Sequence, residues 1–307
     1  MAKPVHSDEY FIETFRKFGG TRTSDILHIS LRSVLRRRRR LEKEIGEPIN
    51  PPNANSAPGR LNIDLNDGVI IIFSDCHYWP DMVPVMHRAL IHFCKKLRPD
   101  YVIANGDICD FAGLSRFDPI GWENRPSVID EIETCQMRLE EVRKATSKAK
   151  HIWTAGNHDI RFESKLAKHL PDMAKVKGVH LRDHFPKWQT TWSAWFNGDL
   201  VVKHRIKGGA NAVRNNVIAT GKHVATGHLH SAKVVPVSAY GETLWGIDCG
   251  TLADCFGPQF MYAEDNPRDW RSGFGILTIR GGMLMQPELV LKVDDNRVEY
   301  QNKLVDV

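Results

Sequence analysis

Five fragments of the chain place Asp, Asn or His directly after a short apolar run, and these side chains can bind divalent metal ions. The first run, over residues 69–73, stops at Asp75 and His77. A strand that carries a carboxylate and an imidazole at its carboxyl end is typical of a site at the edge of an α/β sheet. Together, these ligand types suit manganese, iron or zinc better than calcium or magnesium alone. The fragments are D-x-H at 75–77, G-D-x-x-D at 106–110, G-N-H-D at 156–159, a single His at 204 and G-H-x-H at 227–230.

The elements that position these fragments can be read from the residues around them. The runs that precede them are short and rich in apolar residues, which predicts buried strands. Residues 125–150 between them predict a long amphipathic helix. Asn197 and Gly198 predict a type I′ hairpin that leads into the strand before His204. The sequence therefore predicts strands that each end in a polar side chain.

The ordered set of five motifs resembles the calcineurin-like metallophosphoesterase superfamily over residues 69–253. The G-N-H-D ending and the G-D-x-x-D form are more similar to its phosphodiesterase and DNA-repair nuclease branches than to its Ser/Thr protein phosphatases. The resemblance implies an α/β fold, a four-layer α/β/β/α sandwich with the metal site at the strand ends.

The resemblance also implies a ligand set for two divalent metal ions, with manganese foremost and iron, zinc or nickel as alternatives. Two adjacent cations can activate water and hold the phosphoryl oxygens during in-line displacement. Among the implied ligands His204 has the least specific context, and His184 or His223 could compete with it. One ion would be bound by Asp75, His77 and His230, the other by Asn157, His204 and His228, and Asp107 would bridge the two.

A general acid is implied beside these ligands. His158 follows the ligand Asn157 and would protonate the leaving alkoxide or stabilise charge on the phosphate. An imidazole acid commonly needs a carboxylate partner, and either Asp110 or Asp159 could orient it.

The positive charge of the chain is concentrated near its N-terminus. Residues 1–60 contain 12 Lys and Arg against 7 Asp and Glu, which accounts for the formal net charge of +5. Residues 61–307 contain 30 residues of each sign and are neutral. A basic segment of this kind is typical of nucleic-acid binding.

Residues 1–46 predict a small all-α domain. Aromatic side chains recur at near-helical spacing over 7–18, with Ser7 as a suitable N-cap. Gly19 and the glycine after it would stop this helix. The apolar contacts of the helices that follow are expected from Leu27, Ile29, Val34, Leu35, Leu41 and Ile45.

A helix-turn-helix pattern follows the two glycines. A short helix is predicted over 23–27 and a longer helix, capped by Ser30, over 31–45. His28 stands in the turn between them, where a residue that tolerates left-handed backbone is needed. The pattern resembles the helix-turn-helix of small bacterial and phage DNA-binding domains, with His28 in place of the usual turn glycine.

The resemblance implies that the longer helix enters the major groove of DNA. Its early side chains would contact base edges, and its later arginines would neutralise phosphates. A solvated charged helix that serves solubility or contacts another protein is the alternative. The expected base-reading residues are Arg32, Ser33 and Arg36, and the expected phosphate contacts are Arg37, Arg38, Arg39 and Arg40.

A linker is predicted between the basic N-terminal part of the chain and the neutral remainder. Residues 47–59 include four prolines and several small polar residues, a composition that builds neither a helix nor a central strand. We expect a helix-turn-helix domain over 1–46, a Pro-rich linker over 47–60 and a metallophosphoesterase catalytic domain over 61–307.

Two further groups of residues have alternative interpretations. Trp188, Trp192 and Trp195 are expected in the core, with base stacking as the alternative. Arg161, Arg205 and Lys207 stand beside motif residues and could either hold a substrate phosphate or form structural ion pairs.

The composition excludes several classes of protein. With 42% hydrophobic and 26% charged residues, the chain is neither disordered nor fibrous. Its first residues carry charge where a secretory signal needs an apolar run, so we expect no membrane association and a cytoplasmic location in a bacterial or phage-infected cell. The six cysteines include no C-x-x-C pair and are expected to be reduced thiols.

These patterns predict a two-metal phosphoesterase that cuts phosphodiester bonds of DNA, as a nuclease or nickase, and that reaches DNA through its N-terminal helices. A phosphomonoesterase of the same fold, acting on a protein, nucleotide or small molecule, is the alternative, because fold alone says little about substrate. A DNA-binding regulator with an inactive metal domain is a third hypothesis. The sequence leaves the oligomeric state open.

Overall fold

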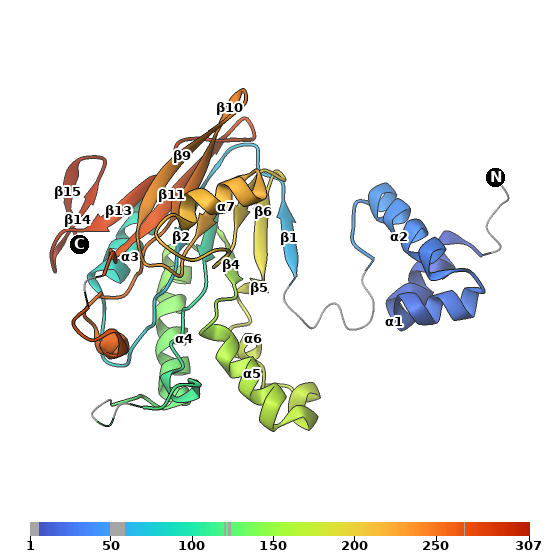
Figure 1. Ribbon diagram of the computed structural model, residues 1–307, viewed down its shortest axis with the longest axis horizontal. Helices are drawn as coiled ribbons and strands as arrows, with labels where there is room; N and C mark the ends of the chain where they lie inside the picture. The colour runs from blue at the N-terminus through green and yellow to red at the C-terminus, as the bar shows by residue number, and fades with distance from the viewer. Residues whose placement is uncertain (1–5, 50–58, 120, 122–123, 267) are drawn as a thin grey trace. The chain divides into compact units, whose positions relative to one another are not determined.

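The chain divides into two compact units, Met1–Gly59 and Arg60–Val307, each with its own hydrophobic core. A computed structural model describes residues 6–49, 59–119, 121, 124–266 and 268–307 (Figure 1). None of the helices within these ranges is both long and apolar enough to cross a lipid bilayer. Most of the linker predicted over 47–60 lies outside the described residues. At its ends, Ile49 is buried in the smaller unit and Arg60 begins a strand.

The smaller unit consists of helix α1 (Asp8–Leu27) and helix α2 (Leu31–Ile45). The predicted stop at Gly19 is a kink within α1: its backbone, with φ of 75°, interrupts the helix, which then resumes. The turn at His28 is left-handed, as predicted, with φ of 51°. The side chain of Ser30 accepts a hydrogen bond from the backbone N–H of Ser33 and caps α2. The helix positions therefore follow the local sequence signals.

The core of the smaller unit differs in part from the predicted one. Leu35 and Ile45 are 37% and 44% exposed, so their prediction as core residues is wrong. Val34 lies on the face of α2 that packs inward, and Leu35, the next residue, lies off that face. Ile45 is the last residue of α2. The buried apolar side chains are Phe11, Phe15, Leu27, Val34, Leu41 and Ile49.

The larger unit contains two β-sheets. The six-stranded sheet has the order β1 (Arg60–Ile63), β6 (Ser193–Phe196), β7 (Leu200–Val202), β8 (His223–Thr226), β10 (Glu242–Asp248) and β9 (Lys233–Ala239). The nine-stranded sheet has the order β15 (Lys303–Asp306), β14 (Arg297–Tyr300), β13 (Glu288–Lys292), β11 (Gly273–Arg280), β2 (Gly68–Phe73), β3 (Tyr101–Ala104), β4 (Lys150–Thr154) and β5 (Gln189–Thr191), with β12 (Met283–Leu284) paired to β11.

Helices accompany these sheets in the larger unit (Figure 1). They are α3 (Val85–Leu97), α4 (Val128–Ala145), α5 (Asp159–His169), α6 (Leu181–His184) and α7 (Ala212–Thr220), with the 3₁₀ turns η1 (Ala112–Leu114), η2 (Pro171–Lys175) and η3 (Pro258–Ala263). Helix α4 is shorter than predicted, because Ser127 and Asp130 form a capping box that fixes its start.

The alternation of side chains along β2 explains how the layers pack. Ile70 and Ile72 join a core between the two sheets that includes Phe196 of β6. Ile71 and Phe73 point to the other face and pack in the core shared with α3 and α4. Helix α7 packs on the outer face of the six-stranded sheet. The order is helices, sheet, sheet, helix, so the predicted four-layer α/β/β/α sandwich is confirmed.

Within each sheet, the strands that precede the five motifs are parallel to one another. Strands β2, β3 and β4 are parallel in one sheet, and β7 and β8 are parallel in the other. The predicted hairpin joins β6 to β7: Asn197 and Gly198 both have positive φ, as a type I′ turn requires. The carboxyl ends of parallel strands share an edge, which brings the motifs of each sheet together.

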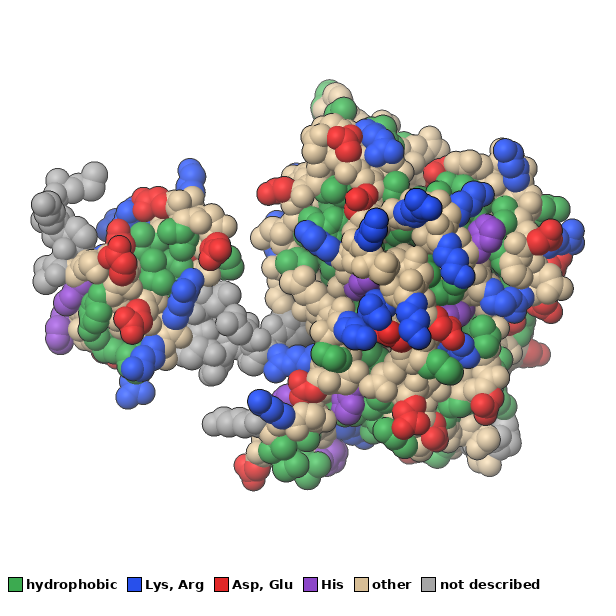
Figure 2. Space-filling view, turned by 180° about the vertical axis from the view of Figure 1, so that it is seen from behind, with side chains coloured by type: hydrophobic (Ala, Val, Ile, Leu, Met, Phe, Trp, Pro, Cys, Tyr) green, Lys and Arg blue, Asp and Glu red, His purple; other side chains and the backbone are tan. Residues whose placement is uncertain are grey.

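The charges of the larger unit are unevenly distributed although it contains 31 basic and 30 acidic residues. On the face in Figure 2, Lys and Arg side chains gather over the middle of this unit. A count along the sequence therefore does not describe the local charge that a ligand would meet.

Candidate metal centre

The first ligand cluster joins Asp75, His77 and His230, which are all buried. His230 Nε2 lies 3.1 Å from Asp75 Oδ1, and His77 Nε2 lies 4.0 Å from the same oxygen. Asp75 Oδ2 also accepts a hydrogen bond of 2.8 Å from the backbone N–H of His228. Residues separated by more than 150 positions in the chain thus meet at one carboxylate.

The second cluster joins Asp107, His204 and His228. His204 Nε2 lies 3.2 Å from Asp107 Oδ2 and 3.3 Å from Asn157 Oδ1. Asp107 Oδ1 accepts a hydrogen bond from the backbone N–H of His158. The seven side chains that the sequence suggested as ligands therefore lie in two adjacent groups, with Asn157 beside the second.

The glycines of the motifs are required by close packing. Each precedes a site residue and leaves no space for a Cβ atom. A side chain on Gly106 would collide with His204, one on Gly156 with Asp107, and one on Gly227 with Asp75.

The backbone of the site is unusual. Five of the seven suggested ligands have positive φ, a conformation that is uncommon for residues other than glycine. Such backbone persists only where surrounding contacts enforce it, and it is concentrated at functional sites. The residues are Asp75, His77, Asp107, His228 and His230.

The donor set fits divalent metal ions. His77 Nε2 and His230 Nδ1 are buried and have no hydrogen-bond partner among the described residues. A buried nitrogen without a partner costs free energy unless another group satisfies it. In each ring the other nitrogen contacts a carboxylate, Asp110 for His77 and Asp75 for His230. Carboxylate, imidazole and amide donors together suit manganese, iron, zinc or nickel.

The electrostatics of the second cluster favour positive charge. Burial lowers the pKa of His204, but the carboxylates of Asp107 and Asp75 outweigh it and raise this pKa to about 10. Burial raises the pKa of Asp107, but His204 and His158 reverse the effect and hold this pKa well below its usual value. Burial, reinforced by His204, lowers the pKa of His228 to about 4 and keeps its imidazole neutral, the form that binds metal.

Asp110 connects the first cluster to His158. Its Oδ1 accepts a hydrogen bond of 2.8 Å from Nδ1 of His77 and lies 2.9 Å from Nδ1 of His158. The same His158 nitrogen also lies 3.0 Å from the backbone carbonyl oxygen of Asp110. The other nitrogen of His158 lies 3.1 Å from Nη2 of Arg161 and 3.9 Å from Asp107 Oδ2. Burial lowers the pKa of His158, but Asp107 and Asp110 outweigh it, so the pKa is raised. His158 is thus oriented by Asp110 with its Nε2 towards the centre.

The expectation that Asp159 could orient His158 is corrected. Its carboxylate accepts hydrogen bonds from the backbone N–H groups of Asp107, Ile108 and Gly156 and from the indole of Trp153. It is fully buried at the start of α5 and makes no hydrogen bond to the His158 ring in the described structure. Asp159 therefore joins the 106–110 and 156–159 loops.

The competing histidines lie elsewhere. His223 Nδ1 accepts a hydrogen bond from the backbone N–H of Trp245, and its Nε2 lies 3.3 Å from Asp199. His184 packs beside the ring of Phe162. Of the three candidates, only His204 belongs to a described cluster of metal-binding side chains.

Some residues of the site had no signal in the sequence. The backbone carbonyl of Asn105 accepts a hydrogen bond of 2.8 Å from His204 Nδ1 and so fixes the ring. The ring of Phe260 packs edge-on against His77, and Trp270 packs against His230. A carbonyl oxygen has no sequence signature, and aromatic residues far along the chain carry no spacing that links them to the motifs.

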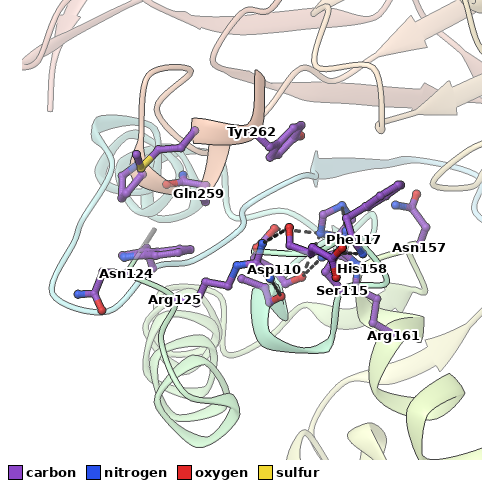
Figure 3. A pocket seen from close by; sticks show the side chains of 15 residues that line it. Asp110, Ser115, Phe117, Asn124, Arg125, Asn157, His158, Arg161, Gln259 and Tyr262 are labelled. Carbon is purple, nitrogen blue, oxygen red and sulfur yellow. Dashed lines mark hydrogen bonds and ion pairs between the residues drawn. The ribbon is translucent and has the colours of Figure 1, made fainter. Parts of the chain in front are cut away.

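A cavity of about 680 Å³ opens beside the centre. Figure 3 shows Asp110, His158 and Arg161 on one side of it, with Gln259 and Tyr262 of η3 across from them. His158 is therefore accessible from the cavity, whereas the first ligand cluster is buried behind it.

The arginines of α2 fall into two groups. Arg37 binds Asp8 and the backbone of His6, so its assignment to phosphate is corrected. Arg38 pairs with Glu42, and Arg40 pairs with Asp8 and Glu44. These carboxylates lie either in α1 or one helical turn along α2 from the arginine that they bind. The arginines of α2 without an ion pair to the described residues are Arg32, Arg36 and Arg39.

Comparisons with known proteins place these features in context. Residues 68–232 match the family model of the calcineurin-like phosphoesterases. The Gene 54 protein of Mycobacterium phage D29 is 26% identical over 226 residues, covering 66% of this chain and 86% of the phage protein. The Gene 54 protein of Mycobacterium phage L5 is 26% identical over 230 residues, with the same coverage. The crystal structure of Chaetomium thermophilum Vps29 aligns at 9% identity and a TM-score of 0.39, covering 77% of this chain and 96% of Vps29.

Proposed function

The chain belongs to the calcineurin-like phosphoesterase family, whose members are metal-dependent hydrolases, and from this premise we propose that it is a DNA phosphodiesterase acting as a nuclease or nickase. The observation that carries the proposal is the convergence of seven side chains that could bind metal beside the His158–Asp110 pair. The pair faces a cavity, where a substrate phosphate has access to it.

The residues of the centre divide the work of hydrolysis. Asp75, His77 and His230 would hold one divalent ion, and Asn157, His204 and His228 the other, with Asp107 between them. When bound, such ions supply Lewis-acid activation of water and neutralise charge on the phosphoryl group.

His158 supplies the proton in this proposal. Asp110 binds its Nδ1 and leaves Nε2 directed to the centre, where it can protonate the leaving oxygen. Arg161 donates to the same Nε2, so it opposes protonation until a phosphate draws its guanidinium away. The acid is thus formed most readily when substrate is present.

Space on two sides of the centre favours a diester over a monoester. The cavity of about 680 Å³ and a second one of about 740 Å³ share the lining residues Asn157, Arg161, Ser115 and Phe117. A phosphodiester carries an organic group on each side of the phosphorus, and each cavity can accept one of them. A monoester would need only one.

The arginines of α2 that have no ion pair with a described residue support DNA as the partner. Arg32, Arg36 and Arg39 follow one another at i, i+4 and i+7, so they share one face of the helix. Such a stripe can neutralise backbone phosphates. We place the enzyme in the cytoplasm of a bacterial or phage-infected cell, where DNA is accessible, and its similarity to phage proteins agrees with this.

Hydrolysis assays with Mn²⁺ test the proposal. Supercoiled plasmid, bis-p-nitrophenyl phosphate and p-nitrophenyl phosphate are compared for the full chain and for residues 60–307, which have their own hydrophobic cores. We expect nicking of plasmid and preference for the diester, with nicking reduced by the truncation. Cleavage of the monoester alone, unaffected by truncation, would replace the proposal with a phosphomonoesterase.

A further inference from the structure

A second cavity beside the centre is lined by basic side chains from separate parts of the larger unit. It has a volume of about 740 Å³, and we call it the basic groove. No Asp or Glu is among its lining residues in the part of the chain that the structure describes. Its basic residues are Arg116, Arg161, Lys165, Lys168, Lys203 and Arg205.

Three of these charges have no ion-pair partner in the part of the chain that the structure describes. Lys165, Lys168 and Lys203 form no ion pair with any described residue, whereas Arg138 and Arg143 of α4 pair with glutamates of their own helix. The unit contains 31 basic and 30 acidic residues, so the concentration of positive charge in one groove is a local feature. It fits a ligand with several negative charges.

The spacing of the basic residues fits an extended ligand. Arg161, Lys165 and Lys168 lie at i, i+4 and i+7 of α5 and so share one face of that helix. Lys203 and Arg205 flank His204 at the end of β7. The charges therefore form a row that begins at the metal centre and continues along α5.

Two aromatic side chains accompany this row. Phe117 is 64% exposed and Trp192 is 41% exposed, and both line the basic groove. The expectation that Trp192 belongs to the core is therefore corrected, while Trp188 is buried as expected. Exposed aromatic rings beside phosphate-binding charges are the combination that binds unpaired bases by stacking.

The basic groove is continuous with the cavity that contains His158. Asn157, Arg161, Ser115 and Phe117 line both, and Figure 3 shows Phe117 and Ser115 close to His158. A chain lying in the groove would thus lead its next phosphate to the centre.

We propose that the basic groove binds a single-stranded segment of a polynucleotide adjacent to the phosphate that is cleaved. This inference rests on the proposed phosphodiesterase function. A single strand is favoured over a duplex because Phe117 and Trp192 can stack only on bases that are exposed. The ligands of the centre are also buried, and a single strand can enter the cavity that leads to them.

Binding of a fluorescein-labelled 12-nucleotide oligothymidylate to the metal-stripped full chain tests the charge row. The combined variant Lys165→Ala, Lys168→Ala, Lys203→Ala should weaken affinity by about tenfold or more and reduce the slope of log affinity against log salt by about 2, since each lost phosphate contact removes roughly 0.7. The matched control Lys95→Ala, Lys96→Ala, Lys148→Ala removes three exposed lysines outside the groove. Equal effects of the two variants would overturn the proposal.

Stacking is tested separately with a strand that has no bases. Phe117→Ala or Trp192→Ala should weaken oligothymidylate binding by about 5- to 100-fold, the range for loss of one stacked base, and should leave binding of an abasic strand unchanged. Trp192→Phe should restore most of the affinity. Equal loss on both strands would contradict a single-strand groove, and so would tighter binding of a duplex than of the single strand by residues 60–307, which lack the arginines of α2.

Hydrolysis of bis-p-nitrophenyl phosphate, measured with Mn²⁺ on the same proteins, separates this proposal from the proposed function. If the unmodified chain hydrolyses bis-p-nitrophenyl phosphate but the groove variants bind the oligonucleotide as tightly as the unmodified chain does, the groove is rejected and the diesterase is retained. If the groove variants weaken oligonucleotide binding but the unmodified chain hydrolyses neither bis-p-nitrophenyl phosphate nor plasmid DNA, the diesterase is rejected and a polynucleotide-binding groove is retained.

Discussion

The two basic regions of the protein differ in what their charges contact. In α2, five arginines follow one another in the sequence, yet Arg37, Arg38 and Arg40 are engaged by carboxylates. In the basic groove, the charges come from separate segments, and Lys165, Lys168 and Lys203 have no carboxylate partner among the described residues. The density of arginine in a sequence is therefore a poor measure of the charge available to a nucleic acid.

The cause of the difference is the spacing of the neighbouring acids. Glu42 and Glu44 lie four residues after Arg38 and Arg40, the separation that allows ion pairs on a helix. Asp8 on α1 accepts from Arg37 across the helix pair. The groove lysines point into a cavity with no described acidic lining.

Only the larger unit contains the proposed metal ligands, and Asp107→Ala should have the largest effect on hydrolysis. We expect hydrolysis of every phosphodiester to fall by about a thousandfold or more, because several kcal/mol of transition-state stabilisation depends on the ions. Oligonucleotide binding by the metal-stripped chain should persist. Asp172→Ala, which removes an exposed carboxylate, serves as the control. Retained hydrolysis in Asp107→Ala would show that the proposed metal centre is not the site of hydrolysis.

His158→Gln should have the next largest effect. Loss of a general acid costs about 10²- to 10⁴-fold in turnover. Metal content, measured by elemental analysis, should remain that of the unmodified chain, because His158 is not one of the seven proposed ligands, although it lies with His77 and Asp110 in a third group of side chains that could hold an ion. Asp110→Asn should cost about 10- to 100-fold, since it acts through the orientation of His77 and His158. Loss of metal in His158→Gln would move this residue into the ligand set.

Much of the larger unit could be predicted from its sequence. The motifs are local: each strand and the ligands that follow it lie within about ten residues, and three of the five motifs add a glycine, so pattern and chemistry coincide. The orienting role of Asp110 could not be separated from that of Asp159, because both follow glycine motifs at similar spacing. Only the fold shows that Asp110 contacts His158 and that Asp159 contacts backbone N–H groups.

The basic groove and the arginine pairing could not be predicted, for the opposite reason. Lys165, Lys203 and Phe117 are far apart in the chain, and nothing local links them. The exposure of Leu35 likewise depends on which side of α2 packs against α1. A sequence shows the types of these residues, whereas their neighbours are decided by tertiary packing.

The pH dependence of stability should separate the larger unit from the smaller one. Burial, partly opposed by Glu141, lowers the pKa of His87 in the larger unit to about 4 from an ordinary 6.5. The neutral form is favoured in the fold, so this stability is complete above pH 6.5 and is lost as pH falls towards 4, by up to about 3 kcal/mol. Denaturant unfolding at pH 7 and pH 5 should show a smaller difference for His87→Gln. An equal difference in both proteins would contradict the assignment.

The smallest expected effects distinguish the two groups of arginines in α2. The combined variant Arg32→Ala, Arg36→Ala, Arg39→Ala should weaken duplex DNA binding and lower the salt slope by about 3, with little change in stability. Arg37→Ala should leave the salt slope nearly unchanged and lower the stability of the smaller unit by about 1 kcal/mol, since it breaks a hydrogen-bonded ion pair with Asp8. Fluorescence anisotropy and thermal unfolding give the two readouts. The reverse pattern would show that the paired arginines bind DNA.

The most direct test of the central claim, a phosphodiesterase built on two metal ions, is a titration of the metal-stripped full chain with Mn²⁺. Bound metal and hydrolysis of bis-p-nitrophenyl phosphate are measured in the same samples. We expect two ions to bind per chain and hydrolysis to rise only as the second ion binds. Saturation at one ion per chain, or hydrolysis that survives complete chelation, would contradict that claim.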